Sequence, residues 1–144
     1  MSFQNAFLGS LVADAISMPV HWYYNRKSLD QDYGDFQGYC KPKAFHPDSI
    51  LWRSSYIPHG PKADILGTQT KYWGQRGIHY HQFLEAGDNT LNLQLAAELY
   101  RETIINGDFD PETWLNRYAQ VMLTPGGQQD TDAEEYHRAL YTHY

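Results

Sequence analysis

Four neighbouring residues, Gly87-Asp88-Asn89-Thr90, stand directly before a run of leucines and alanines. Asp88 or Asn89 can accept hydrogen bonds from the free amides of a first helical turn. A helix N-terminus also carries partial positive charge and unpaired N–H donors. The tetrad is therefore either an ordinary helix N-cap or a place that holds a phosphate, a carboxylate or a cation-binding group of carboxylates.

A second polar group lies close to the N-terminus of the chain. Asp14 stands in the run Ala6–Ile16, among small and apolar residues where a carboxylate is costly to bury unless something binds it. Pro19, His21 and Trp22 follow just beyond the predicted end of this helix. We therefore expect a donor or a ligand beside Asp14, and a polar and aromatic group at the helix end.

The imidazoles of His79 and His81 are two residues apart, so they share one side of an extended segment and could both reach one metal ion. No third ligand follows at a spacing that is typical of zinc sites. The spacing alone therefore favours a structural role for this pair over a metal site.

Composition bounds the class of protein. With 144 residues, 42% of them hydrophobic, the chain is the size of one domain, 1–144, and can fill a core. Eleven Lys and Arg against seventeen Asp and Glu give a net charge of −6, without a basic run that would bind nucleic acid. Cys40 is a single cysteine, and no apolar run approaches the length of about 20 residues that a membrane span needs. These features predict a cytoplasmic protein that does not cross a membrane.

The first predicted helix follows Ser2, a suitable N-cap, and ends near Met18 because Pro19 cannot continue it. From residue 25 to about residue 80 the helical periodicity fades, and prolines and glycines interrupt the chain repeatedly. Such a long irregular segment is typical of lids and binding loops, or it contains short helices. Its aromatic residues either anchor it on the helices, which we favour, or line a cleft: Trp52, Tyr56, Tyr72 and Trp73.

Three more helices are predicted after the tetrad. The first ends at Asn106-Gly107, and the second begins at Asp110-Pro111 with a cap and a proline at its first position. Thr131 and Glu134 match a capping box that would open the last helix. No strand-like alternation is present, so the sequence predicts an all-α fold. The predicted buried face of the second helix consists of Trp114, Leu115, Tyr118, Val121 and Met122.

Two of these segments together resemble the ADP-ribosylglycohydrolase family, which includes dinitrogenase-reductase-activating glycohydrolases and the lens J-crystallins. Gly9–His21 follows the family frame G-x-x-x-G-D-A-x-G-x-P-x-E, and Gly87–Leu91 aligns with a T-D-D-T tetrad before a long Leu/Ala helix. His79–Asn92, Asp130-Thr131 and Glu134–Arg138 further resemble an uncharacterised branch of this family. The resemblance covers this whole chain but only about the first half of a family member.

The resemblance implies an all-α, multi-helix orthogonal bundle in which two magnesium ions orient ADP-ribose so that its glycosidic bond is hydrolysed. Mg²⁺ requires hard oxygen ligands in octahedral order, which carboxylates, amides and hydroxyls supply. By this resemblance the metal ligands are Asp14, Asp88, Asn89 and Thr90. His21 and Asp14 are expected to take part in catalysis, and Trp22 and Asn92 to contact the substrate.

The sequence departs from the family pattern at sensitive positions. Gly87 replaces a threonine and Asn89 replaces a carboxylate, so metal affinity should fall. His21 replaces a glutamate, and it can take up a proton near neutral pH but lacks the negative charge. The family's late D-x-D-D-T/S motif would lie beyond Tyr144, and Asp130-Thr131-Asp132 comes too early to match it.

Two functions are compatible with these features. The first is Mg²⁺-assisted hydrolysis of an ADP-ribosyl or related N- or O-glycosidic bond. The second is a non-catalytic helical scaffold, or a ribose- or nucleotide-binding protein, as the crystallins of the family illustrate. The partner is then a small molecule or an ADP-ribosylated substrate, and exposed core helices are expected to cause self-association.

Overall fold

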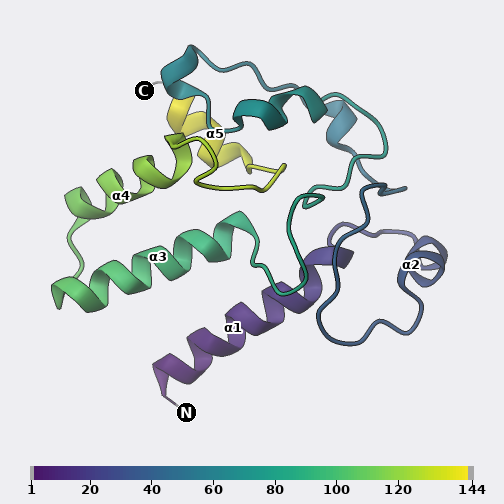
Figure 1. Ribbon diagram of the computed structural model, residues 1–144, viewed down its shortest axis with the longest axis horizontal. Helices are drawn as coiled ribbons and strands as arrows, with labels where there is room; N and C mark the ends of the chain where they lie inside the picture. The colour runs from purple at the N-terminus through teal and green to yellow at the C-terminus, as the bar shows by residue number, and fades with distance from the viewer. Residues whose placement is uncertain (1, 143–144) are drawn as a thin grey trace.

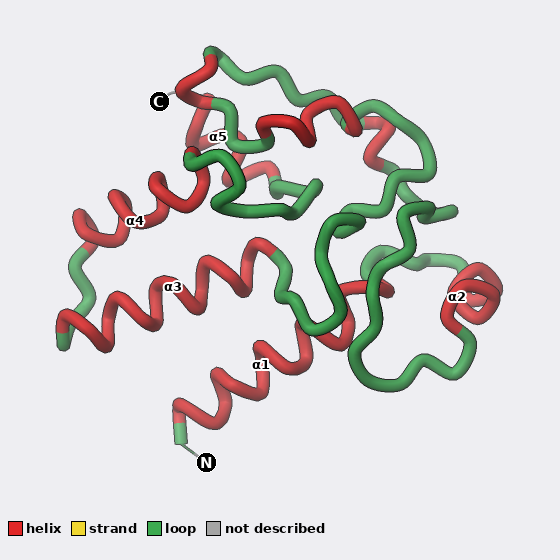
Figure 2. Tube along the Cα trace, in the orientation of Figure 1, coloured by secondary structure: helices red, strands yellow, loops and turns green. Residues whose placement is uncertain are grey.

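The computed structural model describes residues 2–142 of the chain, and within this range it is an all-α protein, as predicted (Figures 1 and 2). Its regular secondary structure consists of the α-helices α1 (Phe3–Ser17), α2 (Arg26–Tyr33), α3 (Leu91–Asn106), α4 (Pro111–Leu123) and α5 (Glu135–Thr142), and the 3₁₀ turns η1 (Met18–Val20), η2 (Leu51–Arg53), η3 (Pro61–Ala63) and η4 (Gly67–Tyr72). In the described range no strand forms, and one isolated antiparallel bridge joins Phe45 and Ile78.

Three predicted helix boundaries are confirmed, and each has a local cause. Ser2 Oγ accepts a hydrogen bond from the Asn5 amide at the start of α1. Gly107 ends α3 with a left-handed φ of 76°, which glycine adopts without steric cost. Asp110 accepts a hydrogen bond from the Thr113 amide at the start of α4.

Two predicted caps are wrong, because distant parts of the chain decide these helix ends. At the start of α3 neither Asp88 nor Asn89 caps the helix; the N-cap is Thr90, and its side chain makes no capping bond. The last helix begins at Glu135 rather than directly after Thr131. Thr131 is fully buried instead, and its carbonyl oxygen accepts a hydrogen bond from the Trp73 indole.

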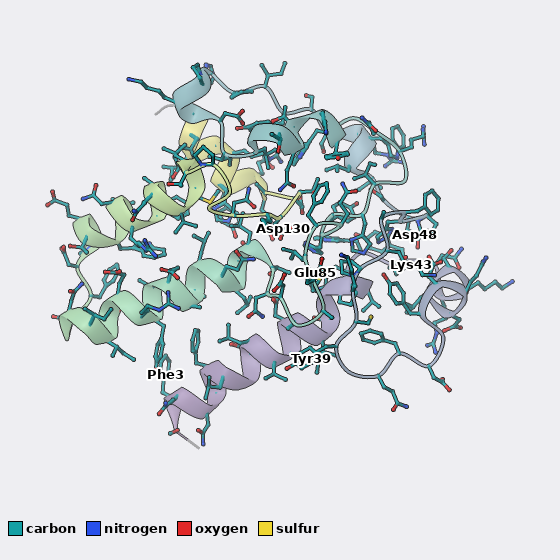
Figure 3. All side chains as sticks on the ribbon, in the orientation of Figure 1. Phe3, Tyr39, Lys43, Asp48, Glu85 and Asp130 are labelled. Atoms are coloured by element: carbon teal, nitrogen blue, oxygen red, sulfur yellow. The ribbon has the colours of Figure 1, made fainter. Side chains whose placement is uncertain are left out.

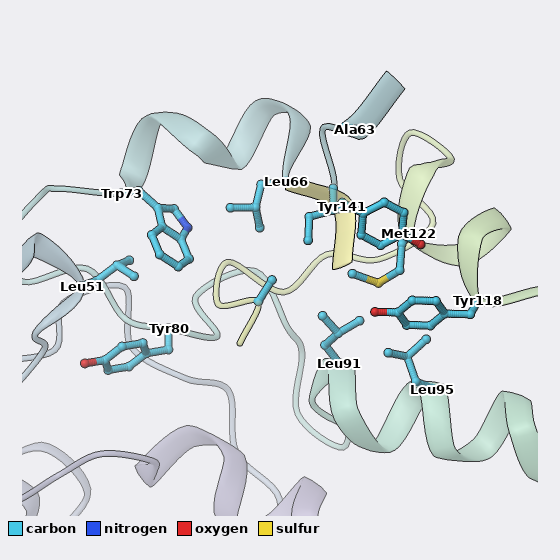
Figure 4. Close-up of a cluster of buried hydrophobic side chains, with 12 residues drawn as sticks. Leu51, Ala63, Leu66, Trp73, Tyr80, Leu91, Leu95, Tyr118, Met122 and Tyr141 are labelled. Atoms are coloured by element: carbon cyan, nitrogen blue, oxygen red, sulfur yellow. The ribbon is translucent and has the colours of Figure 1, made fainter. Parts of the chain in front are cut away.

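The main core lies where α3, α4 and α5 meet the segment that carries η2 and η4 (Figure 4). α3 and α4 pack side by side, with Leu91 and Leu95 of α3 facing Tyr118 and Met122 of α4. The predicted buried face of α4 is therefore largely confirmed. Leu115 is the exception: it is 56% exposed.

The segment between residues 25 and 80 is irregular, as predicted, and it contains one short α-helix and several 3₁₀ turns. Asn25 caps α2 by accepting a hydrogen bond from the Lys27 amide. Trp73 is buried in the main core, and the Tyr56 ring packs against the same cluster. Anchoring of this segment by its aromatic residues is thus confirmed for these two positions.

Helix α1 runs alongside α3 but is covered only in part (Figure 1). The rings of Phe3 and Phe7 contact the Tyr100 ring of α3, with centroids 6.0 and 4.5 Å apart. Phe3 is nevertheless 75% exposed. Among residues 2–142, no helix combines the length and the apolar character needed to span a bilayer.

Candidate functional site

The carboxylate of Asp14 meets the predicted tetrad at the N-terminus of α3. Its Oδ1 accepts a hydrogen bond from Thr90 Oγ1 at 2.8 Å, and its Oδ2 accepts from the Thr90 amide at 2.8 Å and from Asn89 Nδ2 at 3.0 Å. Asn89 Nδ2 also donates to the Leu11 carbonyl oxygen of α1. The structure therefore brings these residues together across about 75 positions of sequence, and the partner that Asp14 required is the start of α3.

Asp88, in contrast, does not join this group of contacts. Its side chain is exposed and folds back on its own turn, where Oδ2 accepts a hydrogen bond from the Glu85 amide at 2.7 Å. The second carboxylate that accepts a hydrogen bond from the α3 N-terminus belongs to Asp130. Its Oδ2 accepts a hydrogen bond from the Leu91 amide at 3.0 Å, and its side chain is almost fully buried.

A cavity of about 80 Å³ opens beside this helix start, and Asp130, labelled in Figure 3, is one of the residues that line it. Four of the predicted site residues line it: His21, Trp22, Thr90 and Asn92. The remaining lining residues were not predicted for the site, and they are His81, Leu91, Asp130, Asp132 and Glu134.

Histidines 21 and 81 connect the cavity to Asp130. His81 Nδ1 donates to Asp130 Oδ1 at 2.6 Å, and His81 Nε2 lies 3.0 Å from His21 Nδ1. His21 Nε2 has the Ser17 hydroxyl as a partner at 3.3 Å. One carboxylate and two imidazoles thus form a continuous hydrogen-bonded relay that can move a proton.

The two rings of the relay differ in proton affinity. Burial lowers the pKa of His21, and the neighbouring His81 lowers it further. Burial also disfavours the charged form of His81, but the hydrogen bond and charge of Asp130 outweigh burial and raise its pKa. A proton that enters this pair is therefore held on the His81 side, next to Asp130.

Two further histidines fix the backbone that presents His21. His46 Nε2 donates to the His21 carbonyl oxygen at 2.8 Å, and His79 Nε2 donates to the Pro19 carbonyl oxygen at 3.0 Å. Their Nδ1 atoms accept hydrogen bonds from the amides of Asp48 and His81, respectively. Both rings are therefore neutral and in one tautomer, and burial lowers the pKa of His79 to about 3. This arrangement agrees with the structural role favoured for His79 over a metal site.

Trp22 lies at the edge of the cavity in a strained conformation. Among residues 2–142 it is the one residue other than glycine with a positive φ, at 65°, which is costly for a bulky side chain. Its ring is 44% exposed and lies 5.8 Å from the Tyr80 ring, centroid to centroid. The hydrogen bonds on either side of Trp22 hold this strain, because His46 binds the carbonyl of residue 21 and Asp48 binds the amides of residues 24 and 25.

Asn92 supports the opposite wall of the cavity. Its Nδ2 donates to Glu134 Oε1 at 2.7 Å, while its Oδ1 accepts from Tyr136 Oη and from His137 Nε2. The hydroxyl of Tyr118 in turn donates to His137 Nδ1 at 2.5 Å. Because every polar atom of the Asn92 amide is engaged, Asn92 orients Glu134 at the cavity.

Asp132 is the cavity carboxyl with the most perturbed proton affinity. Burial disfavours its negative charge, the nearby Asp130 adds repulsion, and together they raise its pKa to about 6. Asp132 therefore changes protonation close to neutral pH, as a general acid must.

The residues do not fit a magnesium site of the kind that the resemblance implies. Both oxygens of Asp14 are engaged by N–H and O–H donors, and one oxygen of Asp88 is engaged within its own turn. Within the described range, no three His, Cys, Asp or Glu side chains are grouped so that they could hold a metal ion. Mg²⁺ needs several convergent oxygen ligands with free lone pairs, and these four residues do not supply them.

The sequence contains a signal for part of the site that spacing arguments missed. Asp130, Asp132 and Glu134 occupy every second position before α5, which places alternate side chains on one side of an extended segment. The same segment also matches a capping box, which predicts a helix start rather than an extended segment. His46, in contrast, stands in an irregular loop and gives no such signal.

Comparison with known proteins identifies no similar protein. No protein family matches the chain, and no curated protein and no solved structure is significantly similar to it. The resemblance to ADP-ribosylglycohydrolases thus depends on the sequence motifs alone.

Proposed function

We propose that the protein hydrolyses an ADP-ribosyl or related N- or O-glycosidic bond, with the sugar held in the cavity beside α3. The observation that supports this proposal most is the relay of Asp130, His81 and His21, which reaches a cavity that also contains an aromatic ring and further carboxyl groups. Glycoside hydrolysis requires such a combination of a base, an acid and groups that stabilise a cationic sugar. The half-buried Cys40 is compatible with a cytoplasmic location.

His21 is the proposed general base. When both rings are neutral, His81 donates its Nδ1 proton to Asp130 and accepts the Nδ1 proton of His21 at Nε2. His21 Nε2 then carries a lone pair, and it can take a proton from a water molecule because the neighbouring Ser17 hydroxyl can donate to the Asp14 carbonyl oxygen instead. The Nδ1 proton of His21 passes to His81 as this occurs, and the positive charge is held next to Asp130.

Asp132 and Glu134 have complementary roles in this proposal. With a pKa of about 6, Asp132 can donate a proton to a leaving group at mildly acidic pH. Glu134, oriented by Asn92, supplies a negative charge for the oxocarbenium-like transition state. The residues present do not fit Mg²⁺, so no step is assigned to a metal.

A second candidate function is ribose or nucleotide binding without turnover, in a helical scaffold. The observation that favours it is the engagement of Asp14, because this carboxylate stabilises the start of α3 and is not free for chemistry. The two candidates differ in whether His21 affects a rate or only an affinity.

Hydrolysis assays separate the two candidates. The protein is incubated with a panel of ADP-ribosyl and N-ribosyl compounds, and free reducing sugar is measured. We expect His21→Asn to lower the rate by about a hundredfold or more, the usual contribution of a general base. His59→Asn is the matched control, because His59 is exposed and lies outside the cavity, and it should retain activity. Binding without sugar release in the wild-type protein would support the scaffold and contradict hydrolysis.

A further inference from the structure

The charge of the cavity restricts the substrates that it can accept. Its lining contains three carboxyl groups, those of Asp130, Asp132 and Glu134, and no Lys or Arg is among the lining residues that the structure describes. Arg138 does not line the cavity, but its charge acts on Asp132 and offsets part of the negative charge, while its guanidinium stacks on the Trp73 ring. His81 donates a hydrogen bond to one of these carboxylates, that of Asp130. The cavity therefore keeps a negative potential, which repels phosphate and attracts a cation.

The α3 N-terminus, which could otherwise attract a phosphate, is already occupied. Two of the amides at this end, those of Thr90 and Leu91, donate to Asp14 Oδ2 and Asp130 Oδ2, respectively. Two internal carboxylates thus neutralise the positive end of the helix dipole. A phosphorylated ligand therefore meets two carboxylates at this helix end, and no Lys or Arg lines the cavity beside it.

At the edge of the cavity, the exposed indole of Trp22 can stack on a flat ring of the substrate. Trp22 is held there, 44% exposed, by contacts on both sides of a strained residue. An indole face attracts a positively charged ring more strongly than a neutral one.

We infer that the substrate is an N-riboside without phosphate groups, whose leaving group is a positively charged aromatic ring stacked on Trp22. This inference rests on the proposed hydrolysis and narrows it to one substrate class. Asp132 and Glu134 face the cationic bond, and the sugar occupies the space beside Thr90 and Asn92.

The reaction of such a substrate needs only water and a base. The bond between the anomeric carbon and the ring nitrogen breaks, and its electron pair neutralises the positive ring, which leaves as a neutral base. A water oxygen bonds to the anomeric carbon and loses one proton to His21 Nε2. The products are ribose, the neutral aromatic base and one proton. No acid has to protonate the leaving group, so the carboxylates serve to stabilise positive charge.

The test compares two probes that differ by one phosphate: nicotinamide riboside and nicotinamide mononucleotide. Release of nicotinamide is measured for the wild-type protein, with inosine as an uncharged N-riboside. We expect kcat/KM for nicotinamide riboside to exceed that for the mononucleotide by about tenfold or more, as expected for repulsion of one phosphate near the carboxylates. Trp22→Ala should reduce the preference for nicotinamide riboside over inosine.

Glu134→Gln provides the charge control. It removes one negative charge from the cavity and should narrow the difference between the two nicotinamide probes, whereas Glu85→Gln, on an exposed residue paired with Lys41, should leave it unchanged. Faster hydrolysis of the mononucleotide, or of ADP-ribosyl compounds, would overturn the inference while hydrolysis itself stands. Absence of hydrolysis for every probe would overturn the proposed function together with the inference.

Discussion

The two ends of helix α3 are built in opposite ways. At the N-terminal end polar side chains converge, and two of them are buried: Thr90 is 6% and Asp130 1% exposed. At the C-terminal end the side chains are apolar and open to solvent, with Ile104 and Ile105 of α3 61% and 68% exposed (Figure 3 shows Phe3 of α1 near this end). Soluble proteins normally show the reverse distribution of polar and apolar groups.

The two ends of α3 are therefore suited to different roles: the polar end to chemistry and the apolar end to association. Buried polar groups are costly unless they are fully paired, so the N-terminal end must be precisely arranged and its few free atoms are candidates for chemistry. Exposed apolar side chains cost little in the monomer and contribute free energy when another surface covers them. We therefore expect substitutions at the polar end to change stability and activity, and substitutions at the apolar end to change self-association.

The largest effect is expected from Asp14→Ala. The substitution leaves the Thr90 amide and hydroxyl without their acceptor and removes a contact of Asn89. The free energy of unfolding should fall by about 4 kcal/mol, since hydrogen bonds to a charged group contribute about 1.5–3 kcal/mol each and Asp14 is only half-buried. Urea denaturation measures this change. Asp88→Ala, with one exposed contact, should cost about 1 kcal/mol or less, and equal costs for the two variants would contradict the comparison.

A smaller effect on the free energy of unfolding is expected when the pH is lowered, because buried His79 lies at the polar end of α3. Histidine titrates near 6.5 in the unfolded chain, whereas burial lowers the pKa of His79 to about 3, so the unfolded state binds more protons below pH 6.5. Between pH 6.5 and 5 this lowers the free energy of unfolding by about 2 kcal/mol. The raised pKa values of His81 and Asp132 act in the opposite direction and offset part of it. The urea concentration at the unfolding midpoint should depend less steeply on pH in His79→Gln than in the wild-type protein. An unchanged pH dependence would show that His79 is not buried in its neutral form.

The apolar end predicts a change in association with almost no change in stability. Ile105→Ser alters a residue that is 68% exposed, so the free energy of unfolding should change by about 0.5 kcal/mol or less. Sedimentation velocity should show concentration-dependent self-association of the wild-type protein that weakens in this variant. If the wild-type protein stays monomeric at all concentrations, the prediction that this end mediates self-association is wrong.

The smallest effect is expected from magnesium. Because the oxygens of Asp14 are engaged by donors and no metal-binding group is found within residues 2–142, millimolar Mg²⁺ should leave the melting temperature unchanged. Thermal denaturation with Mg²⁺, compared with Na⁺ at equal ionic strength, measures this. A clear upward shift that Asp88→Ala abolishes would restore the metal site that the resemblance implies.

The helix boundaries could be predicted from the sequence because their determinants are local. Ser2, Pro19, Gly107 and Asp110 act within one helical turn of the boundary that they set. The α3 N-terminus could not be predicted in the same way, since its acceptors come from residues 14 and 130. A single sequence contains no local trace of such partners.

The site was predictable in part. Of the site residues that the family resemblance indicated, His21, Trp22, Thr90 and Asn92 line one cavity. Asp14 pairs with Thr90 and Asn89 beside it. Asp88 was wrongly expected there, because its carboxylate binds within its own turn. The relay to Asp130 was not predicted, because 49 residues separate His81 from that carboxylate. The tertiary fold alone decides such pairings.

The most direct test of His21 as the base at the polar end of α3 is the pH dependence of kcat/KM for nicotinamide riboside hydrolysis. Burial lowers the pKa of His21, so the rate should stay constant as pH falls to about 6.5 and should decrease only below it, as His21 becomes protonated. In His21→Gln the activity should fall by about a hundredfold and this limb of the profile should disappear. A profile of the same shape and height in His21→Gln would contradict the account.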